Sequence, residues 1–305
     1  STPYYSKDDL KEFLGDQNNG SAFQTYADKV IGTYVGGITG YSYFSTLEGV
    51  RAEQDDPGKQ SYVFGHDYVG GIVGYATGSA ALSGKYKSKT VSRNDNYVIG
   101  CSYVGGVIGA NADIDLTKTQ KETGSSSNDT LSLVENGAKP VVVSDAVNTK
   151  NTVSNWQNTG IVYATETYAG GISGYNTGSL LENSNTSGAA TVAGEYPVSY
   201  AADYVGGIAG LNIGSDTTFT DGTRSYTAGT IEKCSTMSGK TISGNQNLGG
   251  IVGWNLTKGV IRKNTSYANI SATSDNVGGI AGRNSGTIQV AEDKNISRSI
   301  MSSHG

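Results

Sequence analysis

Residues 68–79, YVGGIVGYATGS, decide the fold, because three glycines interrupt a run of β-branched and aromatic residues. Glycine inside a strand loses side-chain packing and backbone entropy, so it marks a bulge, a bend or a close approach of two backbones. Self-similarity at intervals of 20 to 50 residues is typical of stacked repeats, each of which buries its apolar face only against its neighbours. The pattern begins at seven positions: Tyr34, Tyr68, Tyr103, Tyr168, Tyr204, Asn247 and Asn276.

The spacing of these repeats has one irregularity. Most starts are 29 to 43 residues apart, whereas 65 residues separate Tyr103 from Tyr168. This interval is close to two ordinary periods and is rich in Ser, Thr and Asn, so it predicts a long loop or a degenerate coil at about residues 111–160. Loops of this kind carry recognition sites in many solenoids, and a spacer would have the same composition.

Apolar residues flank the glycine pair of every repeat. Valine, alanine or leucine precedes the pair, and isoleucine or valine follows it. The two flanking residues lie three positions apart, which in a regular strand would put them on opposite faces. We expect the glycine pairs to turn a corner of a coil, so that both flanking residues face one interior; the alternative is that both faces of the strand are covered. These structural glycines are Gly36, Gly37, Gly70, Gly71, Gly105, Gly106, Gly170, Gly171, Gly206, Gly207, Gly249, Gly250, Gly278 and Gly279.

A recurring asparagine follows the third glycine in five of the repeats. Asparagine tolerates left-handed backbone conformations, and its amide can hydrogen-bond to the same amide one coil above. Strand-like segments with alternating β-branched residues come next, and helical periodicity is nearly absent. The sequence therefore predicts an all-β fold, a parallel β-helix of right-handed winding. The stacked asparagines are expected to be Asn111, Asn176, Asn212, Asn255 and Asn284.

The N-terminal residues differ from the repeats. Ser6 can cap a short helix that has Leu10, Phe13 and Leu14 on one face and ends at Gly15. An open coil end exposes unpaired strand edges, so solenoids need a lid. We therefore expect residues 1–30 to form an N-terminal cap of a short helix and an entry strand, and residues 31–305 to form the β-helix.

The pattern G-G-[IV]-x-G followed by x-N-x-G-[ST] resembles the GLUG motif. This repeat occurs in large bacterial surface proteins, including filamentous adhesins and the non-catalytic region of IgA-cleaving metallopeptidases of Gram-positive cocci. The resemblance covers roughly residues 1–290 and implies a secreted or cell-surface β-solenoid whose repeats carry no catalytic residue. The chain departs from the pattern in its 65-residue interval, in lacking the asparagine of the first two copies, and in starting the last two with Asn.

Composition excludes several function classes. A net charge of −5 argues against nucleic acid as a partner, because phosphate binding needs a basic surface. No apolar run approaches the length of a membrane span. The two histidines, His66 and His304, do not form a zinc-hydrolase motif, and Cys101 and Cys234 define no disulfide framework. We expect an extracellular module joined to other domains of a larger chain.

The alternative hypothesis for the function is a carbohydrate-active β-helix enzyme, a polysaccharide lyase or hydrolase. Its acids would come from the densest charged stretch, although adjacent aspartates before Pro57 are also typical of a solvated turn. No cofactor is expected apart from calcium, for which Asp113, Asp216 and Asp221 are candidates without the spacing of a known loop. The charged stretch consists of Glu48, Arg51, Glu53, Asp55, Asp56 and Lys59.

Tyrosine is the unusual residue, at 20 copies. The five tyrosines that head repeats should form an aromatic ladder along one corner of the coil, and stacked rings stabilise one another. Aromatic residues just after the third glycine are the better exposed candidates for binding a host or microbial surface glycan or protein. The sequence thus favours a non-catalytic adhesin or stalk. The candidate binding residues are Tyr41, Tyr75, Tyr175 and Trp254.

Overall fold

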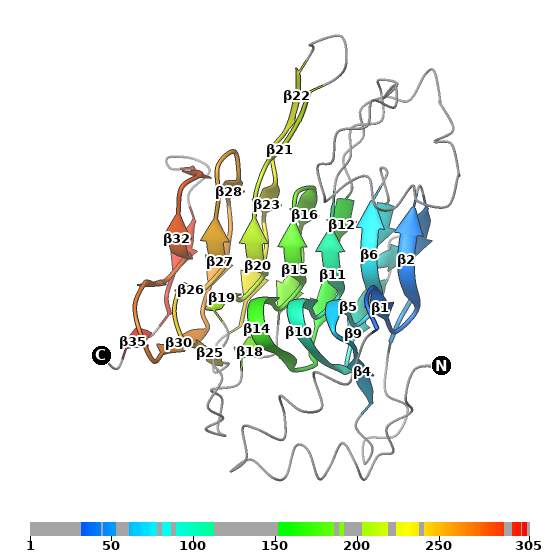
Figure 1. Cartoon of the computed structure of the whole chain (residues 1–305), viewed down its shortest axis with the longest axis horizontal. Coiled ribbons are helices and arrows are strands. Elements are labelled where there is room, and N and C mark those ends of the chain that lie inside the picture. The colour runs from blue at the N-terminus through cyan, green and yellow to red at the C-terminus, as the bar shows by residue number, and fades with distance from the viewer. Residues whose placement is uncertain are drawn as a thin grey trace.

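The structure is a computed structural model in which the chain is all-β (Figure 1). It describes residues 32–43, 45–52, 61–77, 81–86, 90–112, 152–185, 189–191, 203–218, 224–237, 241–289, 295–299 and 301–303. These residues contain no helix, and none of them forms a helix of the length and apolarity that would cross a membrane. The predicted N-terminal helix at residues 6–15 lies outside them.

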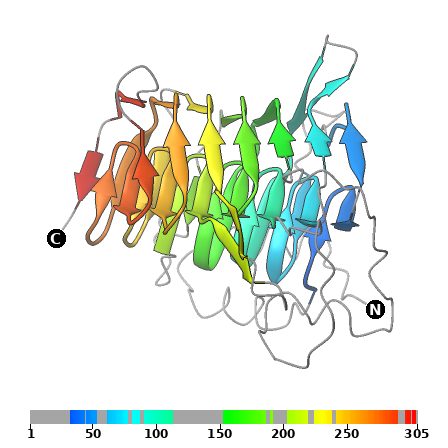
Figure 2. The same cartoon turned by 90° about the horizontal axis from the view of Figure 1, so that it is seen from above.

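Four long sheets, named A to D, run side by side along the molecule, and their strands pair in parallel from coil to coil (Figures 1 and 2). Sheet B contains β2 (Thr39–Tyr43), β6 (Val73–Thr77), β11 (Ile108–Asn111), β15 (Ser173–Asn176), β20 (Ala209–Asn212), β27 (Val252–Asn255) and β32 (Ala281–Asn284). Sheet C contains β3 (Thr46–Glu48), β7 (Ala81–Ser83), β12 (Thr152–Ser154), β16 (Ser179–Leu181), β23 (Thr230–Glu232), β28 (Val260–Arg262) and β33 (Thr287–Ile288).

Sheets A and D complete each coil. Sheet D contains β9 (Thr90–Asn94), β13 (Trp156–Asn158), β17 (Ser184–Asn185), β24 (Ser235–Thr236), β29 (Thr265–Ser266) and β34 (Ile296–Ser297), with β8 (Lys85–Tyr86) antiparallel to β9. Sheet A contains β1 (Val35–Gly36), β4 (Tyr62–Phe64), β5 (Asp67–Gly70), β10 (Tyr97–Gly105), β14 (Val162–Gly170), β18 (Ala189–Thr191), β19 (Asp203–Gly206), β25 (Thr241–Gly244), β26 (Leu248–Gly249), β30 (Asn269–Ala272), β31 (Val277–Gly278) and β35 (Met301–Ser303).

The register matches equivalent positions of successive repeats. Gly70 lies opposite Gly36 in one direction and Gly105 in the other. Parallel strands that pair coil upon coil in this way make a β-solenoid, as the repeat pattern predicts. We number the coils 1 to 7 from the N-terminus, each beginning at its repeat start, two residues before the glycine pair.

The 65-residue interval holds one coil in these sheets. β10 pairs directly with β14, with Gly105 opposite Gly170, and β11 pairs directly with β15. β12 and β13 belong to the same coil, between β7 and β16 and between β9 and β17 respectively. Residues 113–151, between β11 and β12, lie outside the described residues.

A two-stranded antiparallel hairpin projects from coil 5. It consists of β21 (Ser215–Thr218) and β22 (Arg224–Thr227) and interrupts the coil between sheets B and C. Figure 1 shows it rising away from the row of sheet B strands. The 43-residue repeat from Tyr204 is therefore longer than its neighbours because it contains this hairpin.

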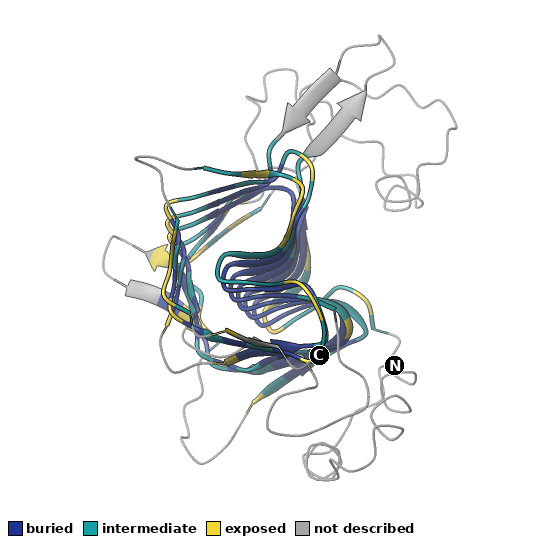
Figure 3. Cartoon of the chain, turned by 90° about the vertical axis from the view of Figure 1, so that its left-hand side faces the viewer, coloured by how far each residue is buried: buried dark blue, intermediate teal, exposed yellow. Residues whose placement is uncertain are grey.

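The interior is divided into two cores, which corrects the expectation of one interior at the glycine pair. In the end-on view, one side of each coil folds inward, and this inward turn is buried (Figure 3). Val69, before the pair, packs in the cluster beside sheet A, whereas Ile72, after it, packs in a separate cluster with the apolar residues of sheets B and C. Both side chains are fully buried. The alternative, in which both faces of the segment are covered, is the observed one.

Close backbone approaches explain all three glycines. A Cβ on Gly105 would overlap the carbonyl oxygen of Ile108 and lie 2.8 Å from the nitrogen of Gly174 in the next coil. A Cβ on Gly106 would overlap the carbonyl oxygen of Gly171 in the next coil and the side chain of Asn158 in sheet D. A Cβ on Gly109 would overlap the backbone of Tyr68 one coil before. The glycines are therefore needed for space between coils.

A ladder of five asparagine amides, four of them buried, runs through coils 3 to 7, as predicted. Each Nδ2 donates to the Oδ1 of the next asparagine, over 2.8, 2.7, 2.8 and 2.8 Å. A second ladder in sheet D joins Asn94, Asn158 and Asn185 over 3.0 and 3.1 Å. Because hydrogen-bonded amides stack at the strand spacing, the ladders hold neighbouring coils in register. The first ladder contains Asn111, Asn176, Asn212, Asn255 and Asn284.

The N-terminal end of the first ladder allows it to be extended. Asn111 Oδ1 is buried without a hydrogen-bond partner, and Ala76 lies opposite Asn111 in coil 2. We expect Ala76→Asn to donate its Nδ2 to Asn111 Oδ1 and to stabilise the fold by about 1 kcal/mol. Ala76→Asp has the same shape but places a carboxylate against that oxygen, so it should destabilise. Thermal unfolding of the two variants checks this; equal shifts would contradict a ladder bond.

Candidate functional site

An aromatic column lies along the outward side of the inward turn, from coil 1 to coil 6. Neighbouring rings in the tyrosine column stack at centroid distances of 5.3, 4.7, 5.1 and 5.1 Å, with interplanar angles between 6° and 22°. Trp254 continues the column on Tyr204 at 5.0 Å and 19°, and Arg283 covers Trp254 at 4.7 Å from its centroid. The predicted tyrosine ladder is thus confirmed for Tyr34, Tyr68, Tyr103, Tyr168 and Tyr204.

The backbone holds these tyrosines in a conformation that large residues rarely adopt. Their φ angles are positive, from 51° at Tyr68 to 63° at Tyr204, and Asn247 and Asn276 continue the series at 58° and 64°. A left-handed conformation costs a residue with a Cβ about 1–2 kcal/mol. Stacking contributes about 0.5–1.5 kcal/mol per pair and offsets this cost. Asparagine in the last two repeats was the sequence signal for this conformation.

A second aromatic row flanks the column on sheet B. Tyr41 stacks on Tyr75 at 5.7 Å and 13°, and Tyr75 meets Tyr34 and Tyr68 edge to face at 5.2 and 5.3 Å. Tyr175 meets Tyr103 in the same way at 5.9 Å. Beyond Tyr75 the row of rings is not continuous, because the register of the sheet B strands places an alanine or a leucine between successive aromatic residues. Its members in chain order are Tyr41, Tyr75, Ala110, Tyr175, Leu211, Trp254 and Arg283.

The four candidate binding residues differ in exposure. Tyr41 is 39% exposed, whereas Tyr75 is only 8% exposed and belongs to a buried cluster with Ala110. The expectation that Tyr75 is an exposed ring is therefore wrong, because it packs between the first tyrosines of the column. Tyr175 and Trp254 are partly buried, with a ring face of each engaged by neighbours. The structure thus brings all four to one face but leaves mainly Tyr41 open.

Three phenols of this face, those of Tyr41, Tyr75 and Tyr168, stay protonated at neutral pH. Burial, with neighbouring phenols as a smaller cause, raises the pKa of Tyr41, Tyr75 and Tyr168 above the usual value. A neutral phenol both donates and accepts hydrogen bonds. The stack occupies the ring faces, so what the column presents to a ligand is ring edges and hydroxyl groups.

Polar side chains line the sheet A side of the column. Ser102 Oγ donates to Glu166 Oε2 at 2.9 Å and accepts from Thr167 Oγ1 at 3.2 Å. Asp203 accepts from Asn245 Nδ2 at 3.0 Å and from Gln246 Nε2 at 2.9 Å. Each carboxylate here is held by its own partners, so hydrogen-bonding groups are spread along the face and not gathered at one point.

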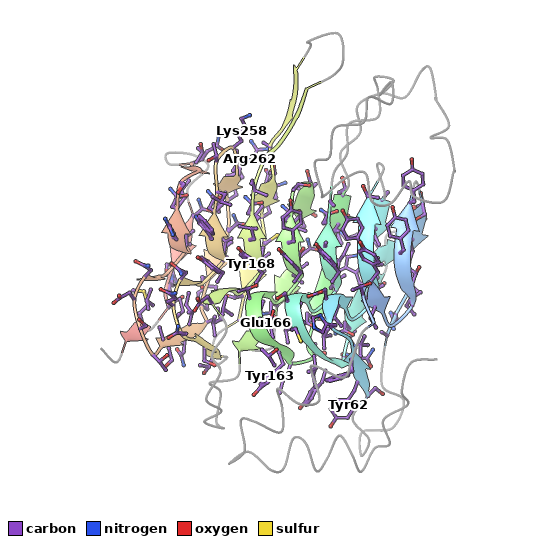
Figure 4. All side chains as sticks on the ribbon, in the orientation of Figure 1. Tyr62, Tyr163, Glu166, Tyr168, Lys258 and Arg262 are labelled. Atoms are coloured by element: carbon purple, nitrogen blue, oxygen red, sulfur yellow. The ribbon has the colours of Figure 1, made fainter. Side chains whose placement is uncertain are left out.

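Of the acids of the enzyme alternative, the structure describes only Glu48. Glu48 is exposed at the end of β3, and Arg51 is exposed after it. The rest of that stretch, Glu53, Asp55, Asp56 and Lys59, lies outside the described residues. Figure 4 shows Glu166 just below Tyr168, and Lys258 and Arg262 at the upper edge of the molecule.

Other charged groups are engaged in separate surface pairs. Glu182 lies 3.8 Å from Lys85 and 3.4 Å from Lys233, and Arg262 Nη2 donates to Glu232 Oε2 at 2.7 Å. Where the chain is described, no three His, Cys, Asp or Glu side chains gather as a metal site. Asp113, Asp221 and the side chain of Asp216, the candidate calcium ligands, lie outside that description.

Both cysteines are buried, and His66 lies beside an aspartate. Cys101 and Cys234 are buried and are not joined by a disulfide. Burial raises the pKa of Cys234 to about 12, which keeps it a thiol. His66 Nδ1 lies 3.0 Å from Asp67 Oδ2, its neighbour in the chain.

The face therefore combines a rigid stacked column with a row of neutral hydroxyls and separately held carboxylates. Such a surface can bind a polar ligand through many weak hydrogen bonds. Comparison with family models, with curated proteins and with solved structures gave no match to this chain.

Proposed function

We propose that this chain is a non-catalytic, extracellular β-solenoid module of a bacterial surface protein, built from GLUG-like repeats and acting as a stalk or an adhesin. The observation that carries the proposal is that polar and aromatic side chains contact their equivalents in the neighbouring coils. The buried amides donate to one another and the rings stack on one another through successive coils. Residues used in this way stiffen a rod.

Two finer features belong to the same proposal. We infer a right-handed winding, because parallel strands joined by a crossover follow that hand almost without exception. We also infer that residues 1–30 cap coil 1. Ile38 of this coil is 47% exposed, and a cap that removed its apolar side chain from water would stabilise the fold.

A host or microbial glycan or protein is the proposed ligand where the module acts as an adhesin. The hydroxyl row and the exposed ring of Tyr41 support this, because amphipathic rings with polar tips suit polar ligands. Saturable binding of the labelled chain to an array of glycans and matrix proteins tests it. We expect Tyr41→Ala and Arg283→Ala to weaken a hit, and Tyr267→Ala, an exposed ring in coil 6 outside both rows, to leave it unchanged.

A blank array favours the stalk, and pulling the chain by its two ends then provides the test. A stalk should resist force and unfold coil by coil. Two results would count against the whole proposal: confinement of the protein to the cytoplasm of the cells that make it, and cleavage of a polysaccharide that is lost on Glu48→Gln.

A further inference from the structure

The tightest contact in the aromatic column joins coils 2 and 3. The rings of Tyr68 and Tyr103 lie 4.7 Å apart between centroids and are inclined by 6°. The backbone fixes this pair on both sides, because Asp67 pairs with Ser102 and Val69 pairs with Val104. The flanking stacks of the column are wider or more tilted, at 5.1 to 5.3 Å and 15° to 22°.

This geometry suits the coupling of two tyrosyl radicals. A phenoxyl radical carries unpaired spin at the carbons ortho to its oxygen, in orbitals perpendicular to the ring. A new bond between two such carbons therefore begins along the ring normal. Parallel stacked rings direct these orbitals toward one another, whereas an edge-to-face pair directs one of them past its neighbour.

We propose that Tyr68 and Tyr103 form a site of oxidative cross-linking, which yields dityrosine between neighbouring coils. The oxidant is a one-electron oxidant of the haem peroxidase class acting with hydrogen peroxide. Each phenol loses one electron and one proton, and the two electrons and two protons reduce one peroxide to two waters. The two radicals join at their ortho carbons. The hydrogen on each joined carbon then leaves as a proton, and a proton adds to each oxygen, which restores both phenols.

The two rings are placed for this reaction and its product is useful to a solenoid. Both residues are only partly buried, and they stand in the same column as Tyr168, which Figure 4 labels. Coils in a solenoid are held only by their nearest neighbours, so they can separate one after another from an end. A carbon–carbon bond between coils 2 and 3 would stop that separation at the position of the bond. This inference does not depend on the proposed function.

The chain contains a matched control pair. Tyr62 and Tyr97 also join coils across paired strands, at 5.6 Å, but their rings are inclined by 87°. Trypsin would release Tyr62 and Tyr68 together on residues 60–85, and Tyr97 and Tyr103 together on residues 94–118. Both possible cross-links therefore join the same two peptides, which removes differences in recovery and ionisation from the comparison.

The experiment treats the whole chain with a haem peroxidase and hydrogen peroxide, follows dityrosine fluorescence, and locates the bond by fragmenting the cross-linked tryptic peptides. We expect the bond at Tyr68 and Tyr103, with a yield independent of protein concentration. Tyr68→Phe and Tyr103→Phe retain a stacked ring but cannot form a phenoxyl radical, so each should lose the product. Tyr62→Phe should retain it.

Three results would overturn the proposal. The first is equal cross-linking of the control pair. The second is a product that appears only as covalent dimers whose amount rises with concentration. The third is persistence of the cross-link at Tyr103 in Tyr68→Phe. Circular dichroism of the phenylalanine variants shows that a lost product is not caused by misfolding.

Discussion

Gly105→Ala should prevent the chain from folding or destabilise it by more than about 4 kcal/mol. The added methyl would overlap the carbonyl oxygen of Ile108 and lie 2.8 Å from the nitrogen of Gly174. Neither atom can move alone, because both belong to backbone hydrogen-bonded between coils. We expect loss of soluble protein or a large drop in the urea midpoint.

Gly100→Ala is the matched control for this change, since it lies in the same strand, β10. Its methyl would lie 2.7 Å from Val69 Cγ2 and 2.9 Å from Val104 Cγ2, which are ends of side chains. Side chains can shift more cheaply than paired backbone, so this variant should fold with a smaller loss. If both changes lowered the free energy of unfolding equally, this would contradict the view that glycine is required at these positions by the close approach of backbones.

Asn176→Ala should destabilise the protein by about 3–5 kcal/mol, because it interrupts the asparagine ladder between two buried members. Asn111 Nδ2 loses its acceptor at 2.8 Å, and Asn212 Oδ1 loses its donor at 2.7 Å. Both side chains are fully buried, so water does not replace the lost partners. An unsatisfied buried polar group costs about 1–3 kcal/mol. Chemical denaturation followed by circular dichroism measures the change.

Asn284→Ala provides the comparison at the exposed end of the same ladder. Asn284 accepts from Asn255 Nδ2 at 2.8 Å but is itself exposed, so water can replace the bond. We expect a loss below about 1 kcal/mol. If Asn176→Ala proved no worse than Asn284→Ala, the ladder would be incidental to stability.

Much of the coil architecture could be predicted from sequence because a repeat reports which residues occupy equivalent positions. Equivalent positions in a solenoid stack directly, so a recurring asparagine or tyrosine implies an amide ladder or a ring stack without further information. The register of Gly70 with Gly36 and Gly105 and the bond from Asn176 to Asn212 agree with this reasoning.

The direction of side chains within a coil could not be predicted in the same way. The residues on either side of each glycine pair enter two different cores, and the candidate ring of Tyr75 is buried. Both outcomes depend on the inward turn, whose Gly106 closely approaches Asn158 of sheet D. Repeats show which positions are equivalent, but they do not show how far the chain bends between them.

The sequence by itself therefore determined the β-solenoid, the stacked amides and the tyrosine ladder, because stacking follows from periodicity alone. Tertiary structure decided the division of the interior, the left-handed backbone under the tyrosines and the union of Trp254 with the column. It also decided the tilt between neighbouring rings, which is smallest for Tyr68 and Tyr103. These features depend on contacts between residues far apart in the chain, which a local pattern does not record.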